Sequence, residues 1–72
     1  MNLRLKMAIL QKFRTQQEFS LAAGIGETMI SKFVRGFKIP SEAQKEAMAK
    51  ALNMPVEELF EPKEAINEYH PG

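Results

Sequence analysis

The segment TQQEFSLAAGIGETMISKFVRG, residues 15–36, decides how this chain folds. Apolar residues at helical spacing lie on both sides of a glycine-containing turn, and a further glycine closes the segment. Glycine tolerates the positive φ with which many helices end. The segment is therefore predicted to form two short helices joined by a tight turn, with the second helix ending at Gly36.

Individual residues mark both ends of the first of these helices. Thr15 and Glu18 have the spacing of a capping box, in which the Thr15 hydroxyl accepts from the Glu18 amide and the Glu18 side chain reaches back. The helix is predicted from residue 16 to about residue 23, with Phe19 buried, and Gly24 ends it. Its inner side also carries three small residues: Ser20, Ala22 and Ala23.

The second helix of the segment is predicted to begin at residue 26 or 27 and to have one apolar and one polar face. Ile25 places an apolar side chain in the turn, and Ile30 and Phe33, three residues apart, face the core. The outer face is then formed by polar and charged residues: Glu27, Thr28, Ser31, Lys32 and Arg35.

One helix is predicted before this segment and two after it. Residues 2 to about 13 form an amphipathic helix, because apolar side chains recur there at spacings of three and four. Ser41 and Gln44 repeat the capping-box spacing and open a fourth helix, which Asn53 stops. Pro55 suits the first turn of a short fifth helix.

These three helices supply the rest of the predicted core. The first carries two apolar rows: Leu3, Met7 and Leu10 in one, and Leu5, Ile9 and Phe13 in the other. The fourth turns five residues inward: Ala43, Ala47, Met48, Ala51 and Leu52. The fifth packs through three residues: Val56, Leu59 and Phe60. We expect a domain over residues 1–60 and a polar C-terminal tail over 61–72, frayed or partly helical, with a short turn possible at 63–69.

The composition restricts the classes of function. A chain of 72 residues makes one small domain, too short for an enzyme cleft beside a separate scaffold. It has no cysteine for a disulfide or a thiolate zinc site, and its one histidine, His70, has no partner at ligand spacing. Glu57 and Glu58 are adjacent on a helix and point apart, which argues against acid–base chemistry. We expect no enzyme activity, no cofactor and no metal.

A membrane partner is not expected either. No apolar run approaches the roughly 18 residues that a membrane-spanning helix needs. Arg4 and Lys6 interrupt the apolar residues at the N-terminus, and no cleavage site typical of a signal peptide follows. The expected location is the cytoplasm.

The charge is small in sum and uneven in distribution. The net charge is +1, but residues 1–38 carry seven Lys/Arg against two Glu, whereas residues 39–72 carry three Lys against seven Glu. The positive half contains the two-helix segment, as a surface that binds phosphate requires. Chance asymmetry in a short chain is the alternative explanation.

Taken together, these features resemble the lambda-repressor-like (XRE or Cro/C1-type) helix-turn-helix family. The resemblance covers residues 3–60. Its elements, in order, are TQ at 15–16, AGI at 23–25, ETMIS at 27–31, RG at 35–36, PS at 40–41 and AKALNMPVEELF at 49–60. It implies an all-α fold of five helices, the second and third forming the helix-turn-helix. It also implies sequence-specific binding of double-stranded DNA by a small prokaryotic or phage transcriptional regulator, usually a homodimer, with the third helix in the major groove.

The resemblance assigns roles to residues of this chain. Four lie where family members touch base edges: Glu27, Thr28, Met29 and Lys32. Five lie near the DNA backbone: Gln16, Gln17, Ser31, Arg35 and Lys38. The chemistry suits these roles, since Lys32 can donate to guanine O6 and N7, and Thr28 and Met29 can meet a thymine methyl.

Other readings stay open. Lys32 and Thr28 can belong to a solvated helix face, Glu27 can complement the helix dipole, and Met29 can be partly buried. The alternative function is an antitoxin-like or other protein-interaction module. Phe19-Ser20 replaces the usual Leu-Ala of the family, and Val34 stands where many members carry Glu. The third helix has two cations, so modest affinity or dependence on dimerisation follows. The dimer surface is expected on the fifth helix and the tail, with four apolar candidates: Val56, Phe60, Ile66 and Tyr69.

Overall fold

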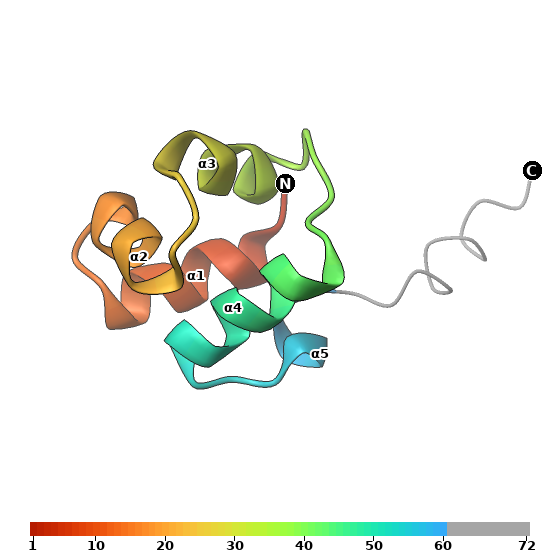
Figure 1. Cartoon of the computed structure of the whole chain (residues 1–72). Helices are drawn as coiled ribbons and strands as arrows, with labels where there is room; N and C mark the ends of the chain where they lie inside the picture. The colour runs from red at the N-terminus through yellow and green to blue at the C-terminus, as the bar shows by residue number, and fades with distance from the viewer. Residues whose placement is uncertain (61–72) are drawn as a thin grey trace, which may run out of the picture.

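Five α-helices follow one another in residues 1–60, the part of the chain that this computed structural model describes (Figure 1). They are α1 (Leu3–Lys12), α2 (Gln16–Ala23), α3 (Glu27–Arg35), α4 (Glu42–Leu52) and α5 (Val56–Leu59). Within the described residues there is no strand, and α1 contacts all four other helices. The predicted all-α fold of five helices is confirmed. The predicted tail over 61–72, with its turn at 63–69, lies outside the described residues.

The predicted helix stops are all present. Gly24 (φ 73°) and Gly36 (φ 85°) end α2 and α3 in the left-handed conformation, where a side chain would be strained. Asn53 (φ 56°) ends α4 in the same way, and asparagine is one of the few other residues that adopt this conformation readily. The ends of α2, α3 and α4 therefore each follow from the type of one residue.

The two predicted capping boxes differ in the structure. At α4, the Ser41 hydroxyl accepts from the Gln44 amide at 3.2 Å and the Gln44 side chain accepts from the Ser41 amide at 2.9 Å. At α2, the Thr15 hydroxyl accepts from the Glu18 amide at 3.1 Å. The Glu18 carboxylate, however, accepts from the amide of Arg14 at 3.1 Å, one residue before the cap. The second half of that prediction is therefore wrong, because the carboxylate satisfies a different backbone donor.

The start of the fifth helix also differs from the prediction. Pro55 is the N-cap residue of α5, with extended backbone angles, and does not lie in its first turn. The helix ends at Leu59, and the Phe60 amide donates to the carbonyl of Val56 at 2.9 Å. α5 is therefore a single turn between two extended residues.

The core draws on every helix. The buried apolar residues are Leu5, Ala8, Ile9, Phe19, Ile30, Phe33, Val34, Met48, Ala49, Leu52, Leu59 and Phe60. Ala8, Val34 and Ala49 were not among the predicted core residues. Ala22 and Ala43, which were predicted to face inward, are exposed. Short side chains at neighbouring positions give little sequence signal for which of them faces the core.

One of the two apolar rows of α1 lies outside the core. Leu5 and Ile9 are buried, whereas Leu3, Met7 and Leu10 are each more than half exposed. A helix packed along one side against its neighbours buries only one stripe of its surface. The exposed row is consequently an apolar outer face of α1, defined by Leu3, Met7 and Leu10.

Asn2 connects three elements that are distant in the sequence. Its side-chain oxygen accepts from the Leu5 amide at 3.0 Å and so caps α1. Its side-chain amide donates to the Leu59 carbonyl at the end of α5, at 2.9 Å. Its backbone amide donates to the carbonyl of Val34 near the end of α3, at 2.8 Å. This residue therefore anchors the start of α1 beside the ends of α3 and α5.

Asn2→Ala should lower the free energy of unfolding by about 2 kcal/mol, since it removes a helix cap worth about 1 kcal/mol and a hydrogen bond worth about 1 kcal/mol. Asn2→Ser is the matched control, because a serine hydroxyl can still cap α1 while the donor to Leu59 is lost, so about half the loss is expected. Urea unfolding followed by circular dichroism measures both. A midpoint in Asn2→Ala equal to that of the unchanged protein would contradict this role.

Candidate nucleic-acid interface

The turn between α2 and α3 has a fixed backbone. The amides of Gly24 and Ile25 both donate to the carbonyl of Ser20, at 2.9 and 3.2 Å, so the end of α2 curls back on itself. Ile25 is half-buried and packs against the core, as predicted, and Gly26 is the N-cap of α3. α2 and α3 are in direct contact. The turn therefore sets the direction in which α3 leaves α2.

α3 is buried on one side and open on the other. Ile30 and Phe33 are buried, as their spacing predicts, together with Val34. A buried position suits the valine that this chain carries at residue 34. On the opposite face four side chains are exposed: Glu27, Thr28, Lys32 and Arg35. Ser31, on the same face, is half-buried. In Figure 1, α3 forms the upper edge of the domain, away from α5.

Met29 lies between these two faces of α3. It is partly buried and packs against the core cluster, so only part of its side chain is available to a partner. Of the four residues expected at base edges, Glu27, Thr28 and Lys32 are therefore fully presented on the outer face, and Met29 borders it.

The start of α2 presents backbone donors. Gln16 and Gln17 occupy its first turn, with Gln17 exposed and Gln16 half-buried. Amides of a first helical turn have no acceptor within their own helix. Thr15 takes up the amide of Glu18, which leaves the amides of Gln16 and Gln17 directed beyond the helix end. These two amides and the positive end of the helix dipole suit an anion.

Three exposed cations lie at or just beyond the C-terminal end of α3. Lys32 and Arg35 lie in its last turn, where positive charge also complements the helix dipole, and Lys38 lies in the loop that follows. Lys38 is on the wall of a groove of about 880 Å³ between this loop, the start of α1 and the start of α4. The guanidinium carbon of Arg35 lies 5.7 Å from the centroid of the Phe37 ring. Phe37 was not predicted as a site residue, although its place in the sequence between Arg35 and Lys38 could have indicated it.

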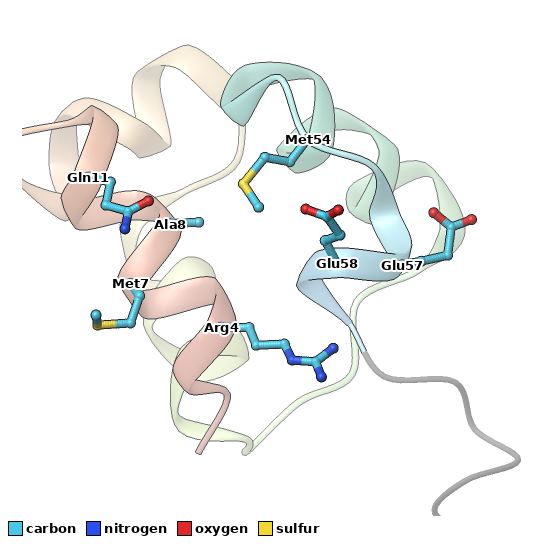
Figure 2. Close-up of a pocket in the computed structure, with 7 residues that line it drawn as sticks. All are labelled: Arg4, Met7, Ala8, Gln11, Met54, Glu57 and Glu58. Atoms are coloured by element: carbon cyan, nitrogen blue, oxygen red, sulfur yellow. The ribbon is translucent and has the colours of Figure 1, made fainter.

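A second, smaller hollow lies between α1 and α5, away from α3. Its volume is about 430 Å³, and its lining includes Arg4, Glu57 and Glu58, with the two glutamate side chains pointing in different directions in Figure 2. The two glutamates diverge, as their adjacent positions predict. No group of three His, Cys, Asp or Glu side chains in residues 1–60 is placed to hold a metal ion.

One of the four predicted dimer contacts, Phe60, is buried in the core. Phe60 is buried (9% exposed) and lies under the Lys45 ammonium group, 5.8 Å from its ring centroid. Val56 is partly buried and packs against the core. Phe60 closes the core beside α1 and α4, so its assignment to a dimer contact is wrong. Ile66 and Tyr69 lie outside the described residues.

The fold and the site define a class of protein. Five helices, a tight α2–α3 turn and an α3 with a polar outer face form a helix-turn-helix domain. A family model described as Helix-turn-helix matches residues 5–59. The chain therefore belongs to the lambda-repressor-like helix-turn-helix family, a family of DNA-binding regulators and not typically of enzymes. No similar curated protein and no similar solved structure was found. None of the described helices is long and apolar enough to cross a membrane.

Proposed function

We propose that this protein binds double-stranded DNA sequence-specifically as a small transcriptional regulator, with α3 in the major groove. The observation that carries the proposal is the polar outer face of α3, a helix of nine residues whose other side is buried in the core. The major groove of B-DNA, about 12 Å wide, admits one α-helix. Sequence is read there by side chains that extend from the exposed face of such a helix.

The residues at the start and middle of α3 have the chemistry for reading bases. Lys32 donates to guanine O6 and N7, and Thr28 hydrogen-bonds a base edge or packs on a thymine methyl. Glu27 accepts from cytosine N4, and the exposed part of Met29 meets a thymine methyl. Glu27 also repels phosphate. Its side chain, in the first turn of α3, is therefore better placed deep in the groove at the base edges than beside the DNA backbone.

The flanking residues have the chemistry for holding the DNA backbone. Arg35 and Lys38 donate to phosphate oxygens on one side, with the Ser31 hydroxyl nearby. Gln16 and Gln17 contribute amides from the start of α2 on the other side. Such contacts fix the register of the protein on DNA and give affinity that depends on salt.

A homodimer is part of the proposal. The outer face of α3 carries two cations, Lys32 and Arg35, against one acid, Glu27, so a single copy binds few phosphates. Two copies related by a two-fold axis would double the contacts, with their α3 helices about 34 Å apart. Sedimentation with and without duplex DNA measures the stoichiometry, and one copy per saturated site would contradict the dimer.

A mobility-shift titration with random-sequence duplex DNA at two salt concentrations tests DNA binding itself. Binding at low ionic strength that weakens steeply with added salt is expected. Absence of any salt-sensitive complex would reject DNA binding and favour the second candidate function, a protein-interaction module. One observation favours that candidate, namely the apolar outer face of α1, whose Leu3, Met7 and Leu10 are each more than half exposed.

Arg35→Ala should weaken specific and non-specific DNA binding to a similar degree. The reason is that a phosphate contact carries no sequence information and releases about one counterion. The slope of log K against log salt should become shallower by about one unit. Lys50→Ala is the matched control, because it removes an exposed positive charge at the end of α4 and should leave the slope unchanged. Equal slopes for all three proteins would show that Arg35 does not contact phosphate.

A further inference from the structure

Phe37 is an aromatic residue in an unusual environment. It is 73% exposed, and it lies directly between the exposed Gly36 and Lys38. Apolar contact with the body of the protein therefore does not explain its position. The contact that the structure does give this ring is to the guanidinium of Arg35, with 5.7 Å between the guanidinium carbon and the ring centroid.

The backbone fixes the point from which the Phe37 side chain leaves the chain. Its amide donates to the Lys32 carbonyl at 2.9 Å, and the Gly36 amide donates to the Phe33 carbonyl at 3.2 Å. This pair of hydrogen bonds, with Gly36 in the left-handed conformation, is the Schellman arrangement at a helix C-terminus. The ring is consequently attached to α3 by a short and well-determined connection, on the same helix end as Arg35.

The contact with the Phe37 ring restricts the rotamers of the Arg35 side chain. A guanidinium within about 6 Å of a ring centroid is attracted by the electrons of the ring face. Contact through the face leaves the N–H groups at the edge of the guanidinium plane free to donate to an anion. An arginine side chain has several rotatable bonds, and ordering it on binding costs conformational entropy. Ordering Arg35 beforehand reduces that cost.

We propose that Phe37 is a positioning residue that holds the Arg35 guanidinium ready for a DNA phosphate. The inference rests on the proposed function, since it names the residue that prepares one of the backbone contacts. Lys38 continues the positive surface beyond the ring. Arginine, an aromatic ring and lysine thus form one phosphate-binding unit at the C-terminal end of α3.

The test uses substitutions in the full chain and mobility-shift titrations with duplex DNA. Phe37→Leu keeps an apolar side chain and removes the ring, so the affinity should fall about two- to five-fold, as expected for an exposed cation–π contact. Phe37→Tyr keeps the ring and should retain the affinity. Ile39→Ala, at another highly exposed apolar residue of the same loop, is the matched control and should have no effect. Unfolding midpoints should not change, because both side chains are exposed.

A double-mutant cycle decides whether Phe37 acts through Arg35. In an Arg35→Ala background, Phe37→Leu should cause no further loss of affinity. Equal binding by Phe37→Leu and the unchanged protein would overturn this inference alone, as would an undiminished effect in the Arg35→Ala background. Absence of salt-sensitive DNA binding by the unchanged protein would overturn the proposed function together with it.

Discussion

Phe19→Ala should remove a large part of the free energy of unfolding of the domain and lower its melting temperature by far more than any exposed substitution. Phe19 is fully buried, and its ring centroid lies 5.4 Å from that of Phe13 at an interplanar angle of 57°. Truncation of a buried phenylalanine costs about 3–5 kcal/mol. A domain of this size has a total stability of only about 4–11 kcal/mol, at roughly 0.05–0.15 kcal/mol per residue. The loss therefore removes a large part of the stability of the fold.

Thermal unfolding followed by circular dichroism measures this effect. Leu21→Ala is the matched control, because Leu21 belongs to the same helix and is 76% exposed. Its free energy of unfolding should change by less than about 0.5 kcal/mol. A Phe19→Ala variant as stable as Leu21→Ala would contradict the described core.

Lys32→Ala should separate specific from non-specific DNA binding. A side chain that donates to a guanine edge contributes about 1–3 kcal/mol of discrimination, so affinity for the preferred site should fall about 5- to 150-fold. Affinity for random-sequence DNA should fall much less, by the loss of one positive charge.

Competition titrations with preferred and random duplexes measure both affinities. Lys50→Ala again serves as the control for loss of an exposed positive charge outside α3. An equal loss on both DNA types in Lys32→Ala would remove Lys32 from the base-reading residues and place it at the backbone.

Helix ends were predictable from the sequence because they depend on local chemistry. Thr15 and Ser41 each accept from an amide three residues later, and the geometry needs nothing from the rest of the chain. Gly24 and Gly36 stop their helices because of their own backbone freedom. The inward position of Phe33 follows in the same way from helical spacing.

Choices between competing packings were not predictable from the sequence. Both apolar rows of α1 have helical spacing, and only the assembled fold shows that the row with Leu5 is buried while the row with Met7 is exposed. Phe60 was predicted both to pack in the core and to contact a second copy, and the structure buries it in the core after a fifth helix of a single turn. Such outcomes depend on which surfaces the other helices bring together.

The candidate site, too, was predictable from the sequence only in part. The polar outer face of α3 follows from the positions of Ile30 and Phe33, three residues apart. The contact between Arg35 and Phe37 does not, because it depends on the reversal of the chain at Gly36 and on the rotamers of two exposed side chains. Asn2 was also missed, although asparagine just before an apolar helix is a typical cap, since its bond to Leu59 joins the two ends of the domain.

Selection of bound sites from a random duplex pool, by the unchanged protein and by Lys32→Ala in parallel, tests the central claim most directly. If α3 reads the major groove, the unchanged protein enriches a defined site. Lys32→Ala then loses the preference at one base position in each half-site and retains the others. The spacing of two symmetric half-sites would also report the dimer. An unenriched pool, or the same preferred site for both proteins at every position, would contradict base reading by Lys32 on α3.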